Sequence, residues 1–445
     1  MVTKSMSDKQ TELEVKHRLR TFLVSVYKGA AQKAICEEHL EELALLAETF
    51  GVEVVGKTPC VVRKFEAATF VTEGKLEELI EAAKEKDAEL VIFDDEISPS
   101  QQRNLEKAFG IPVIDRTELI LEVFAQRAHT KEARLQIKLA QLKYEAPRLK
   151  RLWTHLSRQT GTAGGGSGSG GGGGGYTKGE GEKQIEIDRR ILKRQIDLLQ
   201  KEIEEVRNTR GTQRSARQRS DTPVFSIIGY TNAGKSTLLN ALTSANVLTE
   251  DKLFATLDTT TRKFILQNNQ EILLTDTVGF IRKLPHLLVA AFKSTLEEAV
   301  HADILVHLVD VSHPMAEEQI ETTMEVLKEL GAKDKPIITV LNKIDKCEDK
   351  SIINKLRLKI PKTVPISALN QVGFEDLQAA MILELSKQRR MLRLRIPQSE
   401  YAVVSEVMRV GNIISQQYEE NDVILETELP IALAEKLKRY DMQNI

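Results

Sequence analysis

The segment GYTNAGKST at residues 229–237 has the residue types and the spacing of a phosphate-binding loop. It follows the apolar run VFSII (224–228) and precedes LLNAL (238–242), so a strand, a glycine turn and a helix are predicted in that order. Gly229 and Gly234 let the backbone curve around an anion, so that successive N–H groups and the helix start face its charge. Lys235 would reach the β- and γ-phosphates of a nucleotide, and Ser236 would bind Mg²⁺.

Three segments further along the chain predict which base this site recognises. EILLTDTVGF (271–280) predicts a strand ending in Asp-x-x-Gly, where Asp276 can hold Mg²⁺ through water and the Gly279 N–H can sense the γ-phosphate. IITVLNKID (337–345) ends in Asn-Lys-x-Asp, and Asp345 can accept hydrogen bonds from guanine N1–H and N2–H₂, a donor pair that adenine lacks. TVPISALN (363–370) then places Ser-Ala-Leu where it can support the base. The four segments in this order predict a domain that binds GTP and GDP and hydrolyses GTP.

The candidate site residues come from these segments and from the intervening stretch KLFATLDTTTR (252–262). We take Thr256 as the second Mg²⁺ ligand from the protein, with Thr259, Thr260 and Thr261 as competitors. The candidate catalytic residues are Lys235, Thr256 and Gly279, and the candidate Mg²⁺ ligands are Ser236, Thr256 and Asp276. The candidate nucleotide-binding residues are Gly229, Tyr230, Thr231, Asn232, Ala233, Gly234, Lys235, Ser236, Thr237, Phe254, Ala255, Thr256, Leu257, Asp258, Asp276, Thr277, Val278, Gly279, Asn342, Lys343, Asp345, Ser367, Ala368 and Leu369.

Four further positions bear on the mechanism. The residue after Asp-x-x-Gly is Phe280, which cannot orient water by hydrogen bonding, so slow intrinsic hydrolysis is expected and the missing group must come from elsewhere in the chain or from a partner. The Asn232 side-chain oxygen could hold K⁺ near the phosphates, or Asn232 could stabilise the loop. In HADILVHLVDVSHP (301–314) we expect His307 to be a core residue and Asp310 to be structural.

Composition limits the class of protein. The chain has 445 residues, is 41% hydrophobic and 29% charged, and carries a net charge of −2, so it is not coated in positive charge, although local basic surface could still bind RNA. Cys36, Cys60 and Cys347 lack metal-ligand spacing and indicate reduced thiols. The sequence shows no signal peptide and no membrane-spanning run. We therefore expect a cytoplasmic monomer whose contact with membranes is at most peripheral.

The remaining segments predict a multidomain α/β protein. Residues 1–130 alternate strand and helix patterns, with strands expected at 20–27, 51–56 and 88–96, so they predict a small α/β domain with a mainly parallel sheet. Residues 131–220 predict an antiparallel helical hairpin, because apolar residues step by four and three from Leu135 to Leu156 and again from Leu192 to Val206. Pro147 should kink or interrupt the first helix. Residues 221–390 predict the GTPase domain with a mainly parallel sheet, and 391–445 a small α+β domain of strand, helix, strand and helix.

Two unusual segments belong to the hairpin. The glycine-rich stretch at 161–181 should form a mobile tip, and composition alone leaves open a passive loop, an engineered linker or an active element. VRNTRGTQRSARQRS (206–220), expected to follow the second helix, carries five arginines and no acid. It could be a solvated linker, or it could lie against RNA phosphates.

The combination of GYTNAGKST, LFATLD, DTVGFIRKLPHLLVAAFKSTLEE and NKID closely resembles the HflX family of translation-associated GTPases. FDDEISPSQQRNLE (93–106), IDRTELILEVFAQRAHTKEARLQIKLAQL (114–142) and GEGEKQIEIDRRIL (179–192) resemble the amino-terminal domain and hairpin helices of that family. Two features depart from it. The family often has Pro where this chain has Thr259, and its hairpin tip is usually shorter, so we interpret residues 161–182 as an elaborated tip.

The resemblance implies binding to the large ribosomal subunit and its rRNA, with the amino-terminal domain and hairpin near the peptidyl transferase region. It also implies the separation of stalled or idle ribosomes into subunits, often under stress, with hydrolysis stimulated by the ribosome. The family is also associated with ATP use, which Asp345 should disfavour. Two alternatives remain: a GTPase of large-subunit assembly, and a GTP-gated RNA-binding scaffold in which hydrolysis is incidental.

Overall fold

The computed structural model describes residues 18–148, 178–218, 222–243, 253–254, 259–285, 288, 298–419 and 421–442. The described residues fall into two compact units, the first formed by residues up to Val123 and the second by residues from Phe124 onward. None of the helices in these ranges is long and apolar enough to span a membrane.

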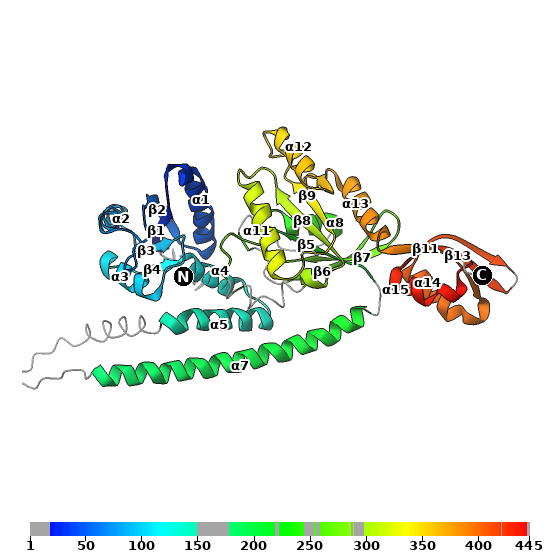
Figure 1. Ribbon diagram of the computed structural model, residues 1–445, viewed down its shortest axis with the longest axis horizontal. Helices are drawn as coiled ribbons and strands as arrows, with labels where there is room; N and C mark the ends of the chain where they lie inside the picture. The colour runs from blue at the N-terminus through cyan, green and yellow to red at the C-terminus, as the bar shows by residue number, and fades with distance from the viewer. Residues whose placement is uncertain are drawn as a thin grey trace, which may run out of the picture. The chain divides into compact units, whose positions relative to one another are not determined.

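The first unit is a parallel α/β domain, as predicted. Its four strands are hydrogen-bonded in the order β2-β1-β3-β4, and every pairing is parallel. Figure 1 shows helix α1 on one side of this sheet and α2 and α3 on the other, as right-handed crossovers in a parallel sheet require. The elements are β1 (Arg20–Tyr27), α1 (Lys33–Phe50), β2 (Glu53–Val61), α2 (Glu73–Glu85), β3 (Leu90–Phe93), α3 (Pro99–Phe109), β4 (Val113–Asp115) and the start of α4 (Arg116–Arg127).

The core of this domain lies on both faces of its sheet, because successive side chains of the central strands point to opposite faces. Phe22 and Val24 of β1, with Val91 and Phe93 of β3, pack in one cluster with apolar residues of α2 and α3. Successive side chains of a strand point to opposite faces, so Leu23 lies on the other face, where α1 is found. Helix α3 begins at a capping box in which the Ser98 side chain accepts the Gln101 backbone N–H and the Gln101 side chain accepts the Ser98 N–H.

The helical hairpin consists of α5 (Lys131–Glu145), a 3₁₀ turn (Ala146–Arg148) and α7 (Lys178–Gln218). The Thr130 hydroxyl caps α5 by accepting the Ala133 N–H at 3.2 Å. The α-helix ends immediately before Ala146 and Pro147, so the predicted interruption is confirmed. The seam residues of α7, from Leu192 to Val206, are half-buried among exposed neighbours, and α5 and α7 contact each other.

Two expectations for the hairpin differ from the structure. The sequence assigns residues 178–181 to the glycine-rich tip, but α7 already begins at Lys178. The arginine run is expected to follow the second helix, but α7 continues to Gln218, because Arg, Gln and Ala all favour helix and no proline interrupts them. The rest of the glycine-rich segment, with Leu149, Trp153 and Leu156, lies outside the described residues.

The predicted GTPase domain is built on a six-stranded sheet in the order β10-β9-β8-β5-β7-β6. Only β6 runs antiparallel to its neighbour β7, so the prediction of a mainly parallel sheet is confirmed. Strand β8 is buried along its whole length, as expected for the centre of a parallel sheet. The elements are β5 (Val224–Gly229), α8 (Lys235–Thr243), β6 (Thr260–Ile265), β7 (Glu271–Asp276), β8 (Ile304–Asp310), α11 (Ala316–Glu329), β9 (Ile337–Asn342), α12 (Lys350–Lys359), β10 (Thr363–Pro365) and α13 (Phe374–Ser386).

The carboxyl-terminal domain is a three-stranded antiparallel sheet, β11-β13-β12, with helices α14 and α15. The predicted order of strand, helix, strand and helix was wrong in one respect, because the second predicted strand is a pair, β12 and β13. The first strand, β11, also starts before the expected boundary at 391. The elements are β11 (Arg389–Pro397), α14 (Tyr401–Val410), β12 (Asn412–Glu419), β13 (Asp422–Pro430) and α15 (Ile431–Lys436).

Candidate functional site

The predicted phosphate loop joins the carboxyl end of β5 to the start of α8. Its glycines are required by close approach: a Cβ added at Gly229 would lie 2.2 Å from the Leu308 backbone oxygen, and one at Gly234 would lie 2.5 Å from Asn342 Nδ2. Both glycines have positive φ, 146° and 95°. Asn232 also lies in the left-handed region at φ 59°, which asparagine tolerates better than most residues. Backbone conformation therefore accounts for an asparagine here, and its binding of K⁺ stays a prediction.

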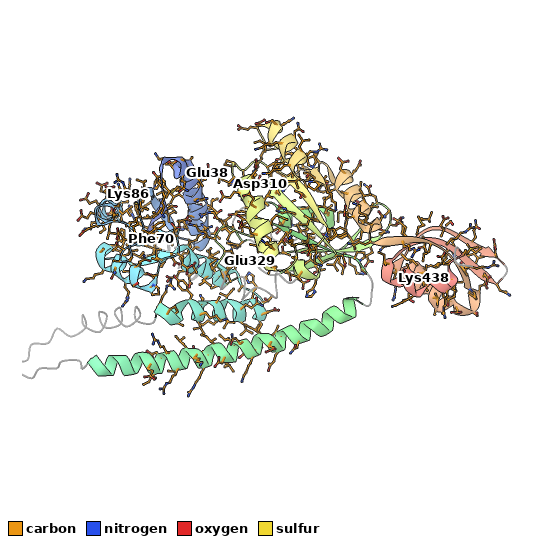
Figure 2. The ribbon with its side chains drawn as sticks, in the orientation of Figure 1. Glu38, Phe70, Lys86, Asp310, Glu329 and Lys438 are labelled. Carbon is orange, nitrogen blue, oxygen red and sulfur yellow. The ribbon has the colours of Figure 1, made fainter. Side chains whose placement is uncertain are left out.

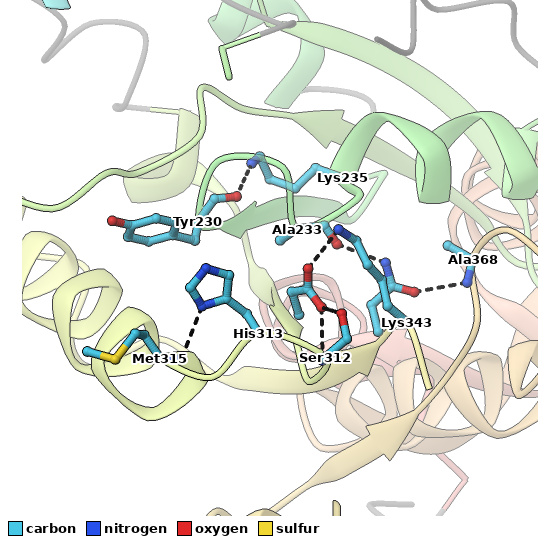
Figure 3. Close-up of polar contacts among 10 residues, drawn as sticks. Tyr230, Ala233, Lys235, Ser312, His313, Met315, Lys343 and Ala368 are labelled. Carbon is cyan, nitrogen blue, oxygen red and sulfur yellow. Dashed lines mark hydrogen bonds and ion pairs between the residues drawn. The ribbon is translucent and has the colours of Figure 1, made fainter. Parts of the chain in front are cut away.

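Lys235, the first residue of α8, is folded back over this loop. Its Nζ donates to the backbone oxygens of Gly229 at 3.2 Å and Tyr230 at 2.8 Å, as Figure 3 shows for Tyr230. Burial lowers its pKa to about 8, with Lys343 adding to the effect and Asp276 opposing it. The Lys235 ammonium is buried and is bonded to backbone oxygens that carry no formal charge. It is therefore suited to bind an anion such as a phosphate.

The two described candidate Mg²⁺ ligands lie together. Ser236 Oγ donates to Asp276 Oδ2 at 2.7 Å, so the end of β7 and the start of α8 meet at this point. A hydroxyl and a carboxylate are the hard oxygen ligands that Mg²⁺ prefers. In the described part of the chain no three His, Cys, Asp or Glu side chains gather to form a metal cage. That is compatible with Mg²⁺, which usually takes one or two carboxylates plus substrate phosphates.

The segment after Asp276 runs against the phosphate loop. The Thr231 N–H donates to Phe280 O at 2.7 Å, and the Phe280 N–H donates to Gly229 O at 3.0 Å. A Cβ at Gly279 would lie 2.8 Å from Thr231 Cα and 2.9 Å from Lys235 Nζ, so only glycine fits at Gly279 in this arrangement. The Gly279 backbone is therefore next to the lysine that is predicted to bind the γ-phosphate.

Phe280 itself is fully buried, with an exposed fraction of 0%. The sequence prediction that this residue cannot orient water is reinforced, because its ring does not face solvent. Sequence analysis missed the contact that fixes the next turn, in which the Tyr230 hydroxyl accepts the Arg282 N–H at 2.7 Å. A tyrosine inside a loop otherwise made of small and polar residues was the available signal.

The predicted base-binding residues are held by side-chain bonds between neighbouring loops. Asn342 Nδ2 donates to Ala233 O at 2.8 Å, and Asn342 Oδ1 accepts the Ala368 N–H at 2.9 Å (Figure 3). Ser367 Oγ donates to Asp345 Oδ1 at 2.5 Å. Asp345 is solvent-exposed. Its carboxylate is thus oriented by Ser367 while it stays accessible to a base.

Asp310, expected to be structural, orients another predicted site residue. Its Oδ2 pairs with Lys343 Nζ at 2.7 Å, while its Oδ1 accepts the N–H and hydroxyl of Ser312 at 3.0 and 2.6 Å. Lys343 has φ 63°, so its backbone is also constrained. His307 of the same strand is buried, and its pKa is lowered to about 4, mainly by burial and further by Lys235, so it is a neutral core residue as expected.

The other predicted positions divide into three groups. Thr237 lies in α8, and Thr277 and Val278 lie between Asp276 and Gly279, with the Thr277 hydroxyl donating to Ile227 O at 2.8 Å. Phe254 is buried and Leu369 is 70% exposed. Ala255, Thr256, Leu257 and Asp258 lie outside the described residues, so the choice of Thr256 stays a prediction. Among its competitors, Thr261 bonds to the Thr275 hydroxyl at 3.1 Å and Thr260 pairs with Asp276 across the β6–β7 ladder.

This parallel sheet, with its glycine loop, buried lysine and Asn-Lys-x-Asp corner at the carboxyl edge, defines a P-loop GTPase domain. Three family models match the chain: GTP-binding GTPase N-terminal at residues 37–125, GTP-binding GTPase Middle Region at 127–217 and 50S ribosome-binding GTPase at 224–343.

Relatives extend the match along the chain. The GTPase HflX of Chlamydia pneumoniae is 47% identical and covers 94% of this chain and 87% of its own length. The GTPase HflX of Akkermansia muciniphila is 46% identical, covering 95% and 96%, and that of Escherichia coli is 41% identical, covering 88% and 90%. A solved GTP-binding protein from Sulfolobus solfataricus in complex with GDP is 26% identical, covers 83% of this chain and 99% of that chain, and has a TM-score of 0.42. The chain belongs to the HflX family of GTPases, and its reaction is the hydrolysis of GTP.

Proposed function

We propose that this GTPase acts on the large ribosomal subunit, where it separates stalled or idle ribosomes into subunits, and that the ribosome stimulates its hydrolysis of GTP. The observation that carries the proposal is Phe280. Its ring is buried and its backbone is bonded to the phosphate loop, so it supplies no water-orienting group. The match of residues 224–343 to a family described as 50S ribosome-binding supports the ribosome as the source of the missing group.

The chain's own residues act on the phosphates in this mechanism. The N–H groups of the loop and Lys235 bind the β- and γ-phosphates, and the Gly279 N–H binds the γ-phosphate as water attacks its phosphorus in line. A bond forms between the water oxygen and the γ-phosphorus, the bond to the β–γ bridging oxygen breaks, a proton of the water passes to the phosphate oxygens or to solvent, and GDP and phosphate leave. Ser236, Asp276 and Thr256 would hold Mg²⁺, which neutralises charge developing on the phosphate oxygens.

Base selection rests on Asp345 and its support by Ser367. The carboxylate would accept both guanine donors, and ATP would leave it without them. GTP is therefore the preferred substrate in the proposed function.

The first test is GTP hydrolysis during a titration with purified large subunits, with small subunits as the control and ATP in a parallel series. We expect large subunits to accelerate GTP hydrolysis by about 10³-fold or more, the scale of a catalytic group supplied in trans, and small subunits to have no effect. An unchanged rate would overturn ribosome-stimulated turnover.

A second measurement separates ribosome splitting from assembly. Intact ribosomes are mixed with the protein and GTP, and the fraction of free subunits is followed by light scattering. Dissociation at a rate that depends on protein concentration supports splitting. Stimulation by large subunits without dissociation of ribosomes would instead favour a role on subunits alone, as in assembly.

A further inference from the structure

The loop that joins β2 to α2, residues 62–72, presents an exposed aromatic ring among cations in the amino-terminal domain. Phe65 is 40% exposed, and Lys28 Nζ lies 4.4 Å from its ring centroid. Arg63 and Lys64 are also exposed. None of the residues of this segment, which we call the Phe65 loop, is among the predicted GTP-site residues.

The ring of Phe65 is anchored to the domain core. It stacks on Phe70 with centroids 4.8 Å apart and ring planes 18° apart. Phe70, labelled in Figure 2, is 9% exposed and meets Phe93 of strand β3 edge-on at 6.4 Å. A row of aromatic rings therefore connects the surface to the sheet, and it restricts the orientation of the exposed ring.

The backbone of the loop is fixed as well. The Glu66 and Phe70 N–H groups each donate to the other residue's oxygen, at 3.2 and 3.0 Å. From α3, Gln101 Nε2 donates to Glu66 O at 3.0 Å and Asn104 Nδ2 donates to Ala68 O at 2.9 Å. Phe70 has φ 67°, a conformation that a bulky residue keeps only where its surroundings enforce it, and such residues gather at functional sites.

The chemistry of this surface favours a nucleic acid over a protein. Lys28 lies over the ring, the exposed Arg63 and Lys64 precede Phe65 in the loop, and Glu66 is the acid in the loop. The cores of protein interfaces are depleted in lysine and other charges. Aromatic rings on which bases stack, combined with cations that follow the backbone, are how proteins hold single-stranded nucleic acid. Ordered aromatic side chains of this kind recognise unpaired bases in RNA.

We propose that the Phe65 loop binds single-stranded RNA, with an unpaired base stacking on the face of the Phe65 ring that Phe70 leaves uncovered. Lys28, which lies over the ring in the free protein, would move from it to a neighbouring phosphate, and Arg63 and Lys64 would contact phosphates as well. The proposal rests on the proposed function and deepens it, because it names one contact through which the amino-terminal domain would engage ribosomal RNA. Gln101 and Asn104 of α3 are positioning residues that hold the loop in its binding conformation.

The experiment measures binding of the full chain to a fluorescent, unstructured 12-nucleotide RNA by anisotropy at several salt concentrations. Phe65→Ala should weaken binding by about 5- to 100-fold, the scale of one base–aromatic stack, and Phe65→Trp should restore it. Arg63→Ala with Lys64→Ala should lower the slope of log affinity against log salt by about 2. Gln101→Ala with Asn104→Ala should weaken binding although every contacting side chain is kept.

Matched controls separate this loop from general effects of substitution. Leu45→Ala removes another exposed apolar side chain, from α1, and Lys84→Ala with Lys86→Ala removes two exposed charges near the end of α2. These variants should bind RNA like the unaltered protein. Thermal unfolding of each variant confirms that the domain is folded.

The same variants are then titrated with large ribosomal subunits while GTP hydrolysis is followed. A Phe65→Ala protein that binds the RNA as tightly as the unaltered protein would overturn the proposal, even if large subunits stimulate both. Loss of affinity for large subunits with unchanged affinity for RNA would also overturn it and indicate a protein contact. Loss of RNA affinity in Phe65→Ala supports RNA binding by the Phe65 loop. This holds even if large subunits fail to stimulate the unaltered protein, an outcome that would overturn only the proposed function.

Discussion

The two parallel sheets of this molecule end in carboxyl edges of opposite character. In the amino-terminal domain Arg116 is 2% exposed, bonds to Asp94 Oδ1 at 2.9 Å and also pairs with Glu42. Asp115 beside it accepts the N–H groups of Ile97 and Glu118, at 3.2 and 2.9 Å. The positive charge of Arg116 is therefore neutralised within the domain itself.

The edge of the GTPase sheet pairs Lys343 with Asp310 but leaves Lys235 and Asp345 without an ion pair of their own among the described residues. Lys235 donates to backbone oxygens, which leave its positive charge in place, and Asp345 is oriented by a neutral serine. A doubly wound sheet therefore does not by itself define a ligand site. The charges that differ between the two edges differ in their partners: Arg116 meets carboxylates, whereas Lys235 and Asp345 are bonded to neutral groups.

The largest effect is expected from a substitution of Arg116 at the edge of the amino-terminal sheet. Arg116→Met should destabilise the amino-terminal domain by about 3–5 kcal/mol, because it leaves the buried Asp94 carboxylate without its cation. Urea unfolding with hydrogen exchange in β1 and β3 would measure it. Arg116→Lys keeps the charge and should cost less. The rate of GTP hydrolysis without ribosomes should stay unchanged in both variants. A loss of this activity together with the loss of stability would contradict the independence of the two edges.

A smaller effect is expected from a substitution of Asp345 at the edge of the GTPase sheet. Asp345→Asn should weaken GTP affinity by about 10- to 100-fold, because one carboxylate acceptor for the guanine donors becomes an amide donor. Fluorescent GDP titration would measure it, with xanthosine diphosphate as the matched ligand that should gain affinity. Asp349→Asn, at the N-cap of α12, is the control. Equal losses for both nucleotides would show that Asp345 does not read the base.

The smallest effect concerns pH. The pKa of Lys235 in the folded protein is about 8, below its ordinary 10.5, so the folded state binds fewer protons than the unfolded state between these values. Its destabilising contribution is therefore complete below pH 8 and declines as pH rises toward 10.5, which should add about 1 kcal/mol to the free energy of unfolding from pH 7 to 9. Comparison with Lys235→Met isolates this slope, and identical slopes would contradict the lowered pKa.

Local sequence signals predicted much of the geometry at the carboxyl edge of the GTPase sheet. Gly229 and Gly234 are recognisable because their motif requires close backbone approach, and the approach of Ser236 to Asp276 follows from the order of strand ends in a parallel sheet. The partnership of Asp310 with Lys343 was not predicted, since an aspartate at the end of a strand is compatible with many roles.

Other features were beyond local signals. Arg116 resembles a surface residue in sequence, and only packing brings it to Asp94 and Glu42. Residues 207–218, the last part of α7, include no large apolar side chain. The sequence there has no helical hydrophobic period that would distinguish a helix from a linker. The sequence predicts one strand where β12 and β13 form a pair, because the two residues between them, 420 and 421, include no glycine or proline to mark a turn.

The Asn342 side chain has one further consequence. A single amide joins the phosphate loop, through Ala233, to the loop that supports the base, through Ala368. Groups that share a hydrogen-bonding partner do not contribute independently. We therefore expect the predicted contacts to guanine and to the phosphates to be coupled, so that the effects of substitutions at both ends of the nucleotide should not be additive.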